Sequence, residues 1–360
     1  MLIASRVLQG ISGAAISVTV VSILTSVYPP GERGRVLGLN VAMTYMGLSV
    51  GPFLGGILTK YFGWRSIFFL IVPIGLAISI LLLRLKKEWA EAKDEKFDYK
   101  GSVIYAISLL GIVMGFSLIH SFWGRVFMAI GFVSLILFCW FENRIEQPIL
   151  DMKLMKNNRI LTFSSLAALI NYSATAAIGY LLSLYLQYIK GFDPTQAGFI
   201  LMAQPVVMAL FSPFAGKLSD RIEPQKVASI GMIITTLGLA FFIFLNENTA
   251  TAYIIFGLLI LGFGFALFSS PNTNAVMSSV EKRYYGVASG ILGAARTVGQ
   301  TFSIGIASLI LAIYMGNVQI TSSNYPLFLT AIKITFTILA VLCFGGIFAS
   351  VARGKINRVE

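Results

Sequence analysis

The chain has 360 residues, of which 57% are hydrophobic and only 12% charged, and its mean hydropathy is +0.83. This composition excludes an ordinary soluble domain. The formal net charge of +12 would suit a nucleic-acid partner if the basic residues were clustered on one soluble face. Cys139 and Cys343 both lie in apolar segments, so the sequence indicates neither a disulfide framework nor a metal site, and no cofactor is expected.

Eleven apolar stretches are each long enough to cross a bilayer as a helix, which takes roughly 20 residues. In chain order they are 2–27, 34–59, 66–85, 101–120, 125–142, 161–188, 195–217, 226–245, 251–274, 286–314 and 328–352. The sequence therefore predicts an all-α polytopic membrane protein that is embedded in the lipid bilayer. No nucleophile–base pair and no phosphate-binding glycine loop occurs, so an enzyme is not expected.

Lysine and arginine alternate between two sets of connections. One set, which includes the segment 84–100 and the C-terminal tail, carries 20 basic residues, whereas the other set carries 4. Because short cytoplasmic loops are enriched in Lys and Arg, the C-terminus is predicted inside the cell and, with eleven spans, the N-terminus outside. The basic surplus thus reflects membrane topology, and no nucleic-acid partner is expected.

A glycine-rich stretch occupies residues 47–56 within the second span. Gly47, Gly51 and Gly55 are spaced by four, so they share one helix face and predict the close approach of another helix. Pro52 and Gly56 are tolerated in a membrane helix because neighbouring helices cover the freed backbone groups. Simple helix packing is the alternative interpretation of this stretch.

The sequence also repeats at an offset of 252 residues, without gaps. The matching pairs are Gly10/Gly262, Gly34/Gly286, Gly38/Gly290, Gly47/Gly299, Ala14/Ala266, Ser17/Ser269 and Ser26/Ser278. They cover two consecutive spans and the basic loop between them in the same register. Parallel repeats of this kind are typical of transporters that hold substrate between two halves.

These motifs together resemble the major facilitator superfamily, and specifically its fourteen-helix drug:proton antiporter branch. The segments that carry the resemblance are Arg6-x-x-Gln9-Gly10, Gly47-x-x-x-Gly51-Pro52-x-x-Gly55-Gly56, Gly63-Trp64-Arg65, Gln187-x-x-x-Gly191-Phe192-x-Pro194 and Gly216-x-Leu218-x-Asp220-Arg221 with Lys226. The resemblance implies a two-bundle fold. Residues 1–85 would be the remnant of the N-terminal bundle, 86–142 a cytoplasmic linker with two extra spans, and 143–360 a six-helix C-terminal bundle with a cytoplasmic tail. The family pattern places three helices before the one with Arg6, so the chain is expected to lack them.

The implied function is proton-coupled export of drug-like or amphipathic compounds by alternating access, in the cell membrane and as a monomer. Aromatic and Met side chains such as Phe68 and Met202 would suit lipophilic cations. However, all fifteen Asp and Glu residues lie in loops or at span ends, whereas proton coupling usually needs an intramembrane titratable group. Two alternatives therefore stay open, namely a transport-inactive fragment or interaction protein, and an exporter of an endogenous metabolite or lipid.

Three groups of residues are candidates for the mechanism. The resemblance assigns coupling and the antiporter motif to Arg6, Gln9, Gly10, Gly47, Gly51, Pro52, Gly55 and Gly56, and gating to Gly216, Asp220, Arg221 and Lys226. Asp220 can act by neutralising the positive N-terminal end of a neighbouring helix, although an ordinary solvated loop charge is the alternative. Residues that line a polar cavity, or only form interhelical hydrogen bonds, are Asn272, Asn274, Arg296 and Gln300.

Overall fold

The computed structural model describes residues 2–84, 98–118, 121–145, 148, 152–316, 318 and 320–354. Within these residues all regular structure is helical, and eleven segments are long and apolar enough to cross a membrane. They are Ala4–Val27, Arg33–Phe62, Arg65–Leu82, Tyr99–Phe116, Phe122–Glu142, Arg159–Ile189, Pro194–Arg221, Pro224–Phe244, Thr251–Met277, Lys282–Met315 and Ser322–Ala352. The predicted fold class and the order of the spans are confirmed. His120, the one histidine of the sequence, lies outside the described residues.

Some spans are single α-helices and others are assembled from shorter pieces. The α-helices are α1 (Leu2–Val27), α2 (Arg33–Phe62), α3 (Arg65–Leu82), α4 (Tyr99–Ser117), α5 (Phe122–Glu142), α6 (Met152–Asn157), α7 (Arg159–Thr175), α8 (Ala177–Leu184), α9 (Pro194–Leu201), α10 (Ala203–Arg221), α11 (Pro224–Phe241), α12 (Thr251–Met277), α13 (Tyr285–Met315) and α14 (Tyr325–Ala352). The remaining pieces are a π-helical turn, η1 (Tyr185–Ile189), and the 3₁₀ turns η2 (Phe242–Phe244), η3 (Lys282–Tyr284) and η4 (Ser322–Asn324).

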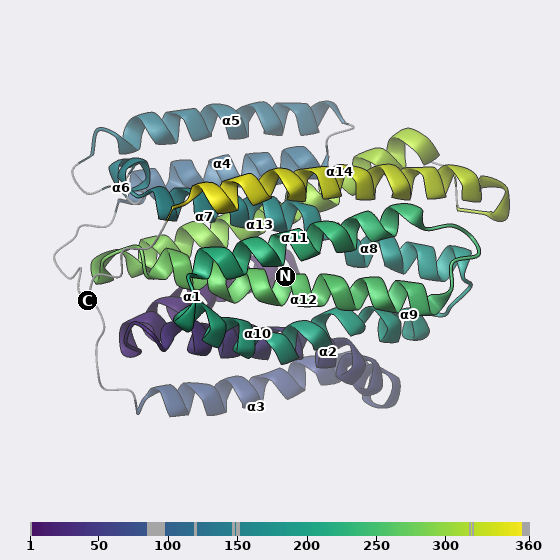
Figure 1. The fold of residues 1–360 in the computed structure, drawn as a ribbon, viewed down its shortest axis with the longest axis horizontal. Coiled ribbons are helices and arrows are strands. Elements are labelled where there is room, and N and C mark those ends of the chain that lie inside the picture. Colours follow the sequence, from purple (N-terminus) through teal and green to yellow (C-terminus); the bar gives the residue numbers. More distant parts are fainter. Residues whose placement is uncertain are drawn as a thin grey trace.

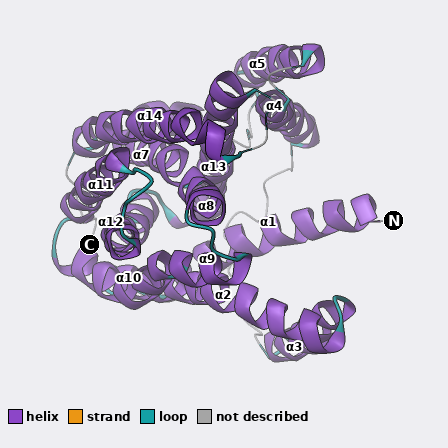
Figure 2. Cartoon of the chain, turned by 90° about the vertical axis from the view of Figure 1, so that its right-hand side faces the viewer, coloured by secondary structure: helices purple, strands orange, loops and turns teal. Residues whose placement is uncertain are grey.

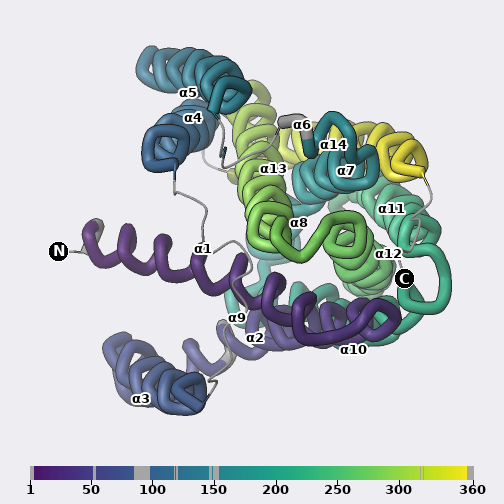
Figure 3. The backbone as a smooth tube through the Cα atoms, turned by 90° about the vertical axis from the view of Figure 1, so that its left-hand side faces the viewer, coloured from purple at the N-terminus to yellow at the C-terminus, as the bar shows by residue number. Residues whose placement is uncertain are grey.

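The long helices lie along one axis of the molecule (Figure 1). Helices α7, α11, α12 and α14 form a bundle, with α13 on one side and α10 on another, and α4 and α5 form a hairpin beyond α13 (Figure 2). The first turns of α1 project away from this bundle, and so does α3 (Figure 3). Consistent with this, residues 4–17 are exposed, whereas Ser289 and Ser22 tie the last turns of α1 to α13 through hydrogen bonds of 2.9 and 3.2 Å.

Two spans are interrupted: proline explains one break, and a neighbouring hydroxyl group accommodates the other. Pro205 has no N–H with which to bond the carbonyl of Leu201, four residues earlier, and α9 ends at Leu201. Between α7 and α8 the amide of Ala177 instead donates to Ser303 Oγ on α13 over 2.9 Å. A neighbouring hydroxyl thus satisfies the backbone group that the break frees, as a membrane interior requires.

Glycine sets the closest helix contacts. A Cβ on Gly34 of α2 would lie 2.3 Å from the Gly216 carbonyl oxygen of α10, and a Cβ on Gly38 would lie 2.4 Å from the Ser212 carbonyl oxygen. The hairpin uses the same device, since a Cβ on Gly111 of α4 would lie 2.7 Å from Cα of Gly131 on α5. Only glycine allows two backbones to approach this closely.

The close approach predicted at Gly47, Gly51 and Gly55 is wrong for the residues that the structure describes. A Cβ on Gly47 or Gly51 would have no neighbour within 4 Å, and one on Gly55 would only touch Ile67 at 3.9 Å. The tight contact with α10 instead uses Gly34 and Gly38, the glycines nearest the N-terminus of α2. The continuous α2 helix passes through position 52 without a break.

We predict that Gly38→Ala destabilises the protein by about 1–3 kcal/mol, because the added methyl group would overlap the backbone of α10. The measurement is unfolding of the purified chain in detergent. Gly290→Ala is the matched control, because Gly290 is the repeat partner of Gly38 and a Cβ there would have no neighbour within 4 Å. Equal losses of stability in the two variants would contradict the packing seen here.

Candidate functional site

Asp220 joins the end of α10 to the beginning of α2. Its Oδ1 accepts the Gly34 N–H at 2.8 Å and its Oδ2 accepts the Arg35 N–H at 2.9 Å. These amides belong to the first turn of α2, where no intrahelical carbonyl is available, and Glu32 at the N-cap makes no side-chain capping bond. The buried carboxylate therefore caps a neighbouring helix and places a negative charge at its positive end. The Gly-x-Leu-x-Asp-Arg pattern predicted a contact of this kind for Asp220.

Helix α12 completes this arrangement, which we call the Asp220 clamp and define as Gly34, Gly216, Ser219, Asp220 and Asn274. Asn274 Nδ2 donates to Ser219 Oγ at 2.9 Å and lies 3.4 Å from Asp220 Oδ1. Ser270 Oγ, also on α12, donates to the Gly34 carbonyl at 3.2 Å. The structure thus brings together residues that the sequence assigned to separate gating and cavity groups.

The other predicted gating residues lie at the edge of the clamp. Arg221 and Lys226 are exposed, one at the last residue of α10 and the other in the first turn of α11. Gly216 acts through its missing side chain, since a Cβ there would lie 2.0 Å from the Gly34 carbonyl oxygen. The sequence pattern that identified Asp220 gave no indication that Gly34 would be its partner.

A second network at the same end of the molecule centres on Arg353, which sequence reasoning counted only as a basic tail residue. Its guanidinium is 1% exposed and donates through Nη1 to Asn272 Oδ1 at 2.8 Å and to Ser164 Oγ at 3.2 Å. Nε donates to the Ser350 carbonyl oxygen at 2.7 Å, and Nη2 contacts the Ser350 hydroxyl. Burial lowers the pKa of Arg353 to about 9. One cation thereby joins the ends of α7, α12 and α14.

We call this end of the bundle, which holds the Asp220 clamp and Arg353, the basic end. A cavity of about 970 Å³ opens there, and residues from five of the basic segments, including the C-terminal tail, line it together. Its charged lining residues are Arg33, Arg159, Asp220, Glu281, Lys282 and Arg353. Loops that the charge pattern assigned to one side of the membrane therefore meet at one end of the molecule, where the C-terminal turn of the described chain also lies (Figure 1).

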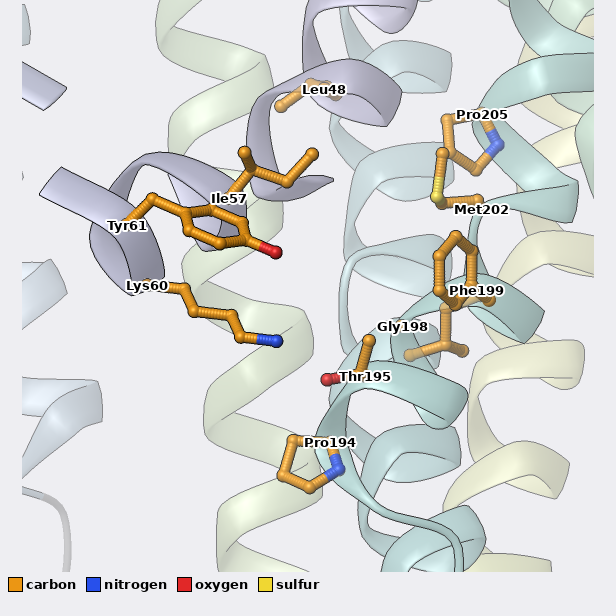
Figure 4. A pocket seen from close by; sticks show the side chains of 12 residues that line it. Leu48, Ile57, Lys60, Tyr61, Pro194, Thr195, Gly198, Phe199, Met202 and Pro205 are labelled. Carbon is orange, nitrogen blue, oxygen red and sulfur yellow. The ribbon is translucent and has the colours of Figure 1, made fainter. Parts of the chain in front are cut away.

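At the opposite end of the molecule, α2 and the α9–α10 span are separated by an open pocket. A pocket of about 800 Å³ lies between α2 and the α9–α10 span, lined mainly by apolar side chains such as Leu48, Ile57, Phe199 and Met202. Lys60 and Tyr61 of α2 extend toward Pro194 and Thr195 of α9 (Figure 4). Of the glycine-rich motif, Gly56 lines this pocket. Its volume is within the usual range for sites that bind drug-sized molecules.

Aromatic rings and one arginine lie between the two ends. Phe265 of α12 contacts Tyr45 of α2 and Tyr172 of α7, with ring centroids 5.8 and 5.4 Å apart. Arg296 of α13 places its Cζ 5.4 Å from the centroid of the Tyr172 ring, and its side chain is otherwise exposed. Arg296, Tyr172 and Asn272 border a cavity of about 20 Å³, which has room for one water molecule.

The remaining candidates lie apart from this centre. Gln300 is exposed one turn along α13 from Arg296, and it does not line the small cavity. Arg6 Nη1 donates to Gln9 Oε1 at 2.8 Å on the exposed part of α1, and a Cβ on Gly10 would have no neighbour within 4 Å. Asn272 and Asn274 are both buried in interhelical hydrogen bonds, one with Ser164 and Arg353 and the other within the Asp220 clamp.

Comparison with known proteins agrees with the membrane fold and its paired spans. The family model for the Major Facilitator Superfamily matches residues 1–303 and 164–355. The chain belongs to this superfamily, and it is accordingly a multi-pass transporter of the cell membrane rather than an enzyme.

Relatives at 27–30% identity carry different substrate names. The riboflavin transporter RibZ of Clostridioides difficile is 27% identical over 354 residues, which cover 97% of this chain and 76% of that protein. The quinolone resistance protein NorB of Staphylococcus aureus is 30% identical, with coverage of 92% and 73%. The multidrug resistance protein Stp of Mycobacterium tuberculosis is 29% identical, and the match covers 88% of this chain but only 59% of Stp.

A solved structure supports the fold. The human organic anion transporter MFSD10 superimposes with a TM-score of 0.66 at 15% identity, over 97% of this chain and 70% of that chain.

We predict that Asp220→Asn weakens the cap on α2 by about 0.3–2 kcal/mol, because asparagine keeps one acceptor oxygen and loses the charge. Hydrogen exchange of the Gly34 and Arg35 amides should become faster, while the chain still inserts into the membrane. Glu223→Gln is the control, since Glu223 lies three residues away and forms no side-chain cap. Unchanged exchange in Asp220→Asn would show that the clamp does not hold α2.

We also predict that Arg353→Lys lowers the stability by about 1–3 kcal/mol, because a single ammonium group cannot reach Ser164, Asn272 and Ser350 together. The midpoint of thermal unfolding in detergent measures this effect. Arg221→Lys serves as the control at an exposed arginine of the same end. If both substitutions shift the midpoint equally, the Arg353 network is not a structural tie.

Proposed function

We propose that this protein exports amphipathic compounds by alternating access, coupled to proton entry, as a member of the fourteen-helix drug:proton antiporter branch. The observation that carries the proposal is the contrast between the two ends of one helix pair. At the basic end α2 and α10 are in backbone contact and capped by Asp220. Farther along, α2 and the α9–α10 span separate around a pocket of about 800 Å³.

The charge pattern gives this contrast a direction. The basic end is expected to face the cytoplasm, so the α2–α10 crossing is closed on the inside, beside the cavity of about 970 Å³, and the same pair of spans is open toward the outside. Export would then require the Asp220 clamp to open while the other end closes. A contact that is made in one state only biases the equilibrium between the two states, and this is the gating role that we assign to Asp220.

The coupling residues and domain boundaries rest on the resemblance to the same branch. We assign 1–85 to an N-terminal bundle, 86–142 to a linker with two extra spans, and 143–360 to a C-terminal bundle, in a monomer. Gly47–Gly56 would seal the path when the pocket closes, because its small residues leave room for α9. Arg6 and Gln9 would act beside the path. The names of NorB and Stp support a drug-like substrate.

An endogenous planar metabolite is the second candidate substrate, because the match to the riboflavin transporter RibZ extends over 97% of this chain. A transport-inactive membrane protein that keeps the fold is the third candidate. These three functions differ in what crosses the membrane, and the spans hold no carboxylate in their middle. Proton movement therefore has to be measured directly.

The decisive experiment reconstitutes the full chain in liposomes with a pH-sensitive dye inside. We expect a quinolone to accumulate inside the liposomes when their interior is acidic, because protons that leave through an antiporter drive the drug inward, and proton efflux should increase when the drug is added. Asp220→Asn should change the transport rate, whereas Glu223→Gln should not. Transport of riboflavin without the quinolone would favour the metabolite transporter. No movement of either compound by a folded chain would support the inactive membrane protein.

A further inference from the structure

The pocket between α2 and the α9–α10 span carries a positive charge on an otherwise largely apolar lining. Its lining is apolar and aromatic apart from a few polar groups, and Lys60 is the charged residue among the described residues that line it. Figure 4 shows the Lys60 amine extended across the pocket toward Thr195. The ring of Tyr61 lies 5.5 Å from the amine and supports a cation at this position.

No carboxylate neutralises Lys60 in the described part of the chain. The acidic residue next to the pocket in sequence is Asp193, whose Oδ1 already accepts the N–H groups of Thr195 and Gln196 at 2.8 and 2.9 Å. Gln196 completes this capping box by accepting the Asp193 N–H. The Asp193 charge thus stabilises the start of α9, and Lys60 keeps a positive charge facing the pocket.

The centre of the molecule also places a cation beside aromatic rings, without a carboxylate among the described residues that neutralises it. Arg296 is exposed beside the rings of Tyr172, Phe265 and Tyr45, and none of the spans contains a carboxylate in its middle. An exposed guanidinium without a counter-ion is unfavourable inside a membrane, and a ligand that supplies the negative charge removes this penalty. Aromatic rings next to it offer stacking surfaces for a planar body.

Building on the proposed transport function, we propose that the substrates are amphipathic anions with a planar aromatic body. The body lies against the apolar lining of the pocket, and the anionic group pairs with Lys60. Pairing with Arg296 at the centre then requires the cavity of about 20 Å³ beside it to widen during transport. A lipophilic cation, which the aromatic and Met content alone suggested, would meet like charge at both positions and bind more weakly. The charge of the ligand thereby becomes the main selection criterion.

Three pyrene compounds with the same four-carbon chain test this proposal, ending in a carboxylate, a carboxamide or a trimethylammonium group. Binding to the purified full chain is measured by equilibrium dialysis in detergent, which requires no transport. We expect the carboxylate to bind about tenfold tighter than the trimethylammonium compound, since one charge-assisted hydrogen bond accounts for a difference of this size. Equal binding, or tighter binding of the cation, would overturn the proposal.

Variants at position 60 separate charge from shape. Lys60→Gln should lose most of the preference for the carboxylate, Lys60→Arg should keep it, and Lys60→Glu should reverse it toward the cation. Lys333→Gln, an exposed lysine on α14 outside both sites, is the control and should leave the preference unchanged. A preference that persists in Lys60→Glu would refute the role of Lys60.

Transport of the same compounds in liposomes distinguishes failure of this inference from failure of the proposed function. If the cation is exported and the anion is not, the protein is an exporter and the charge assignment is wrong. If the carboxylate binds selectively but none of the three compounds crosses the membrane, the charge assignment stands and the export function is refuted.

Discussion

The contact between the beginning of α2 and the end of α10 organises the molecule, because a helix cannot begin inside a membrane protein with its first amides unsatisfied. Here the cap is supplied by Asp220 from a span almost 190 residues away in sequence, at 2.8 and 2.9 Å. The two backbones can approach this closely only because Gly34 and Gly216 lack side chains. Charge, backbone satisfaction and packing therefore depend on one another at a single crossing.

This crossing also determines where the molecule is open. Helix α2 packs along α10, and the pocket lies farther along α2, beside the break that Pro205 makes in the α9–α10 span. Under the gating role proposed for Asp220, release of the clamp would let α2 move, and a charge at a helix end could then influence the pocket farther along α2.

Buried and exposed cations have different roles in this chain. Arg353 is enclosed by neutral hydrogen-bond acceptors of three helices and acts as a structural tie. Lys60 and Arg296 instead point their charge into accessible space beside aromatic rings. These three cations therefore differ in their surroundings, and the proposed substrate contact is assigned only to the two that face accessible space.

The sequence by itself determined the membrane class, the number and order of the spans, and the position of Asp220 at a helix end. These features depend on hydropathy and loop charge, which are local properties of the chain that decide which segments enter a bilayer. Tertiary structure decided which helices touch. It placed the close contact at Gly34 and Gly38 rather than at Gly47, Gly51 and Gly55. It also buried Arg353, which the sequence suggested to be a charged tail residue, in hydrogen bonds to neighbouring helices. Glycine spacing shows where a helix can be approached, but the partner depends on how all the spans assemble.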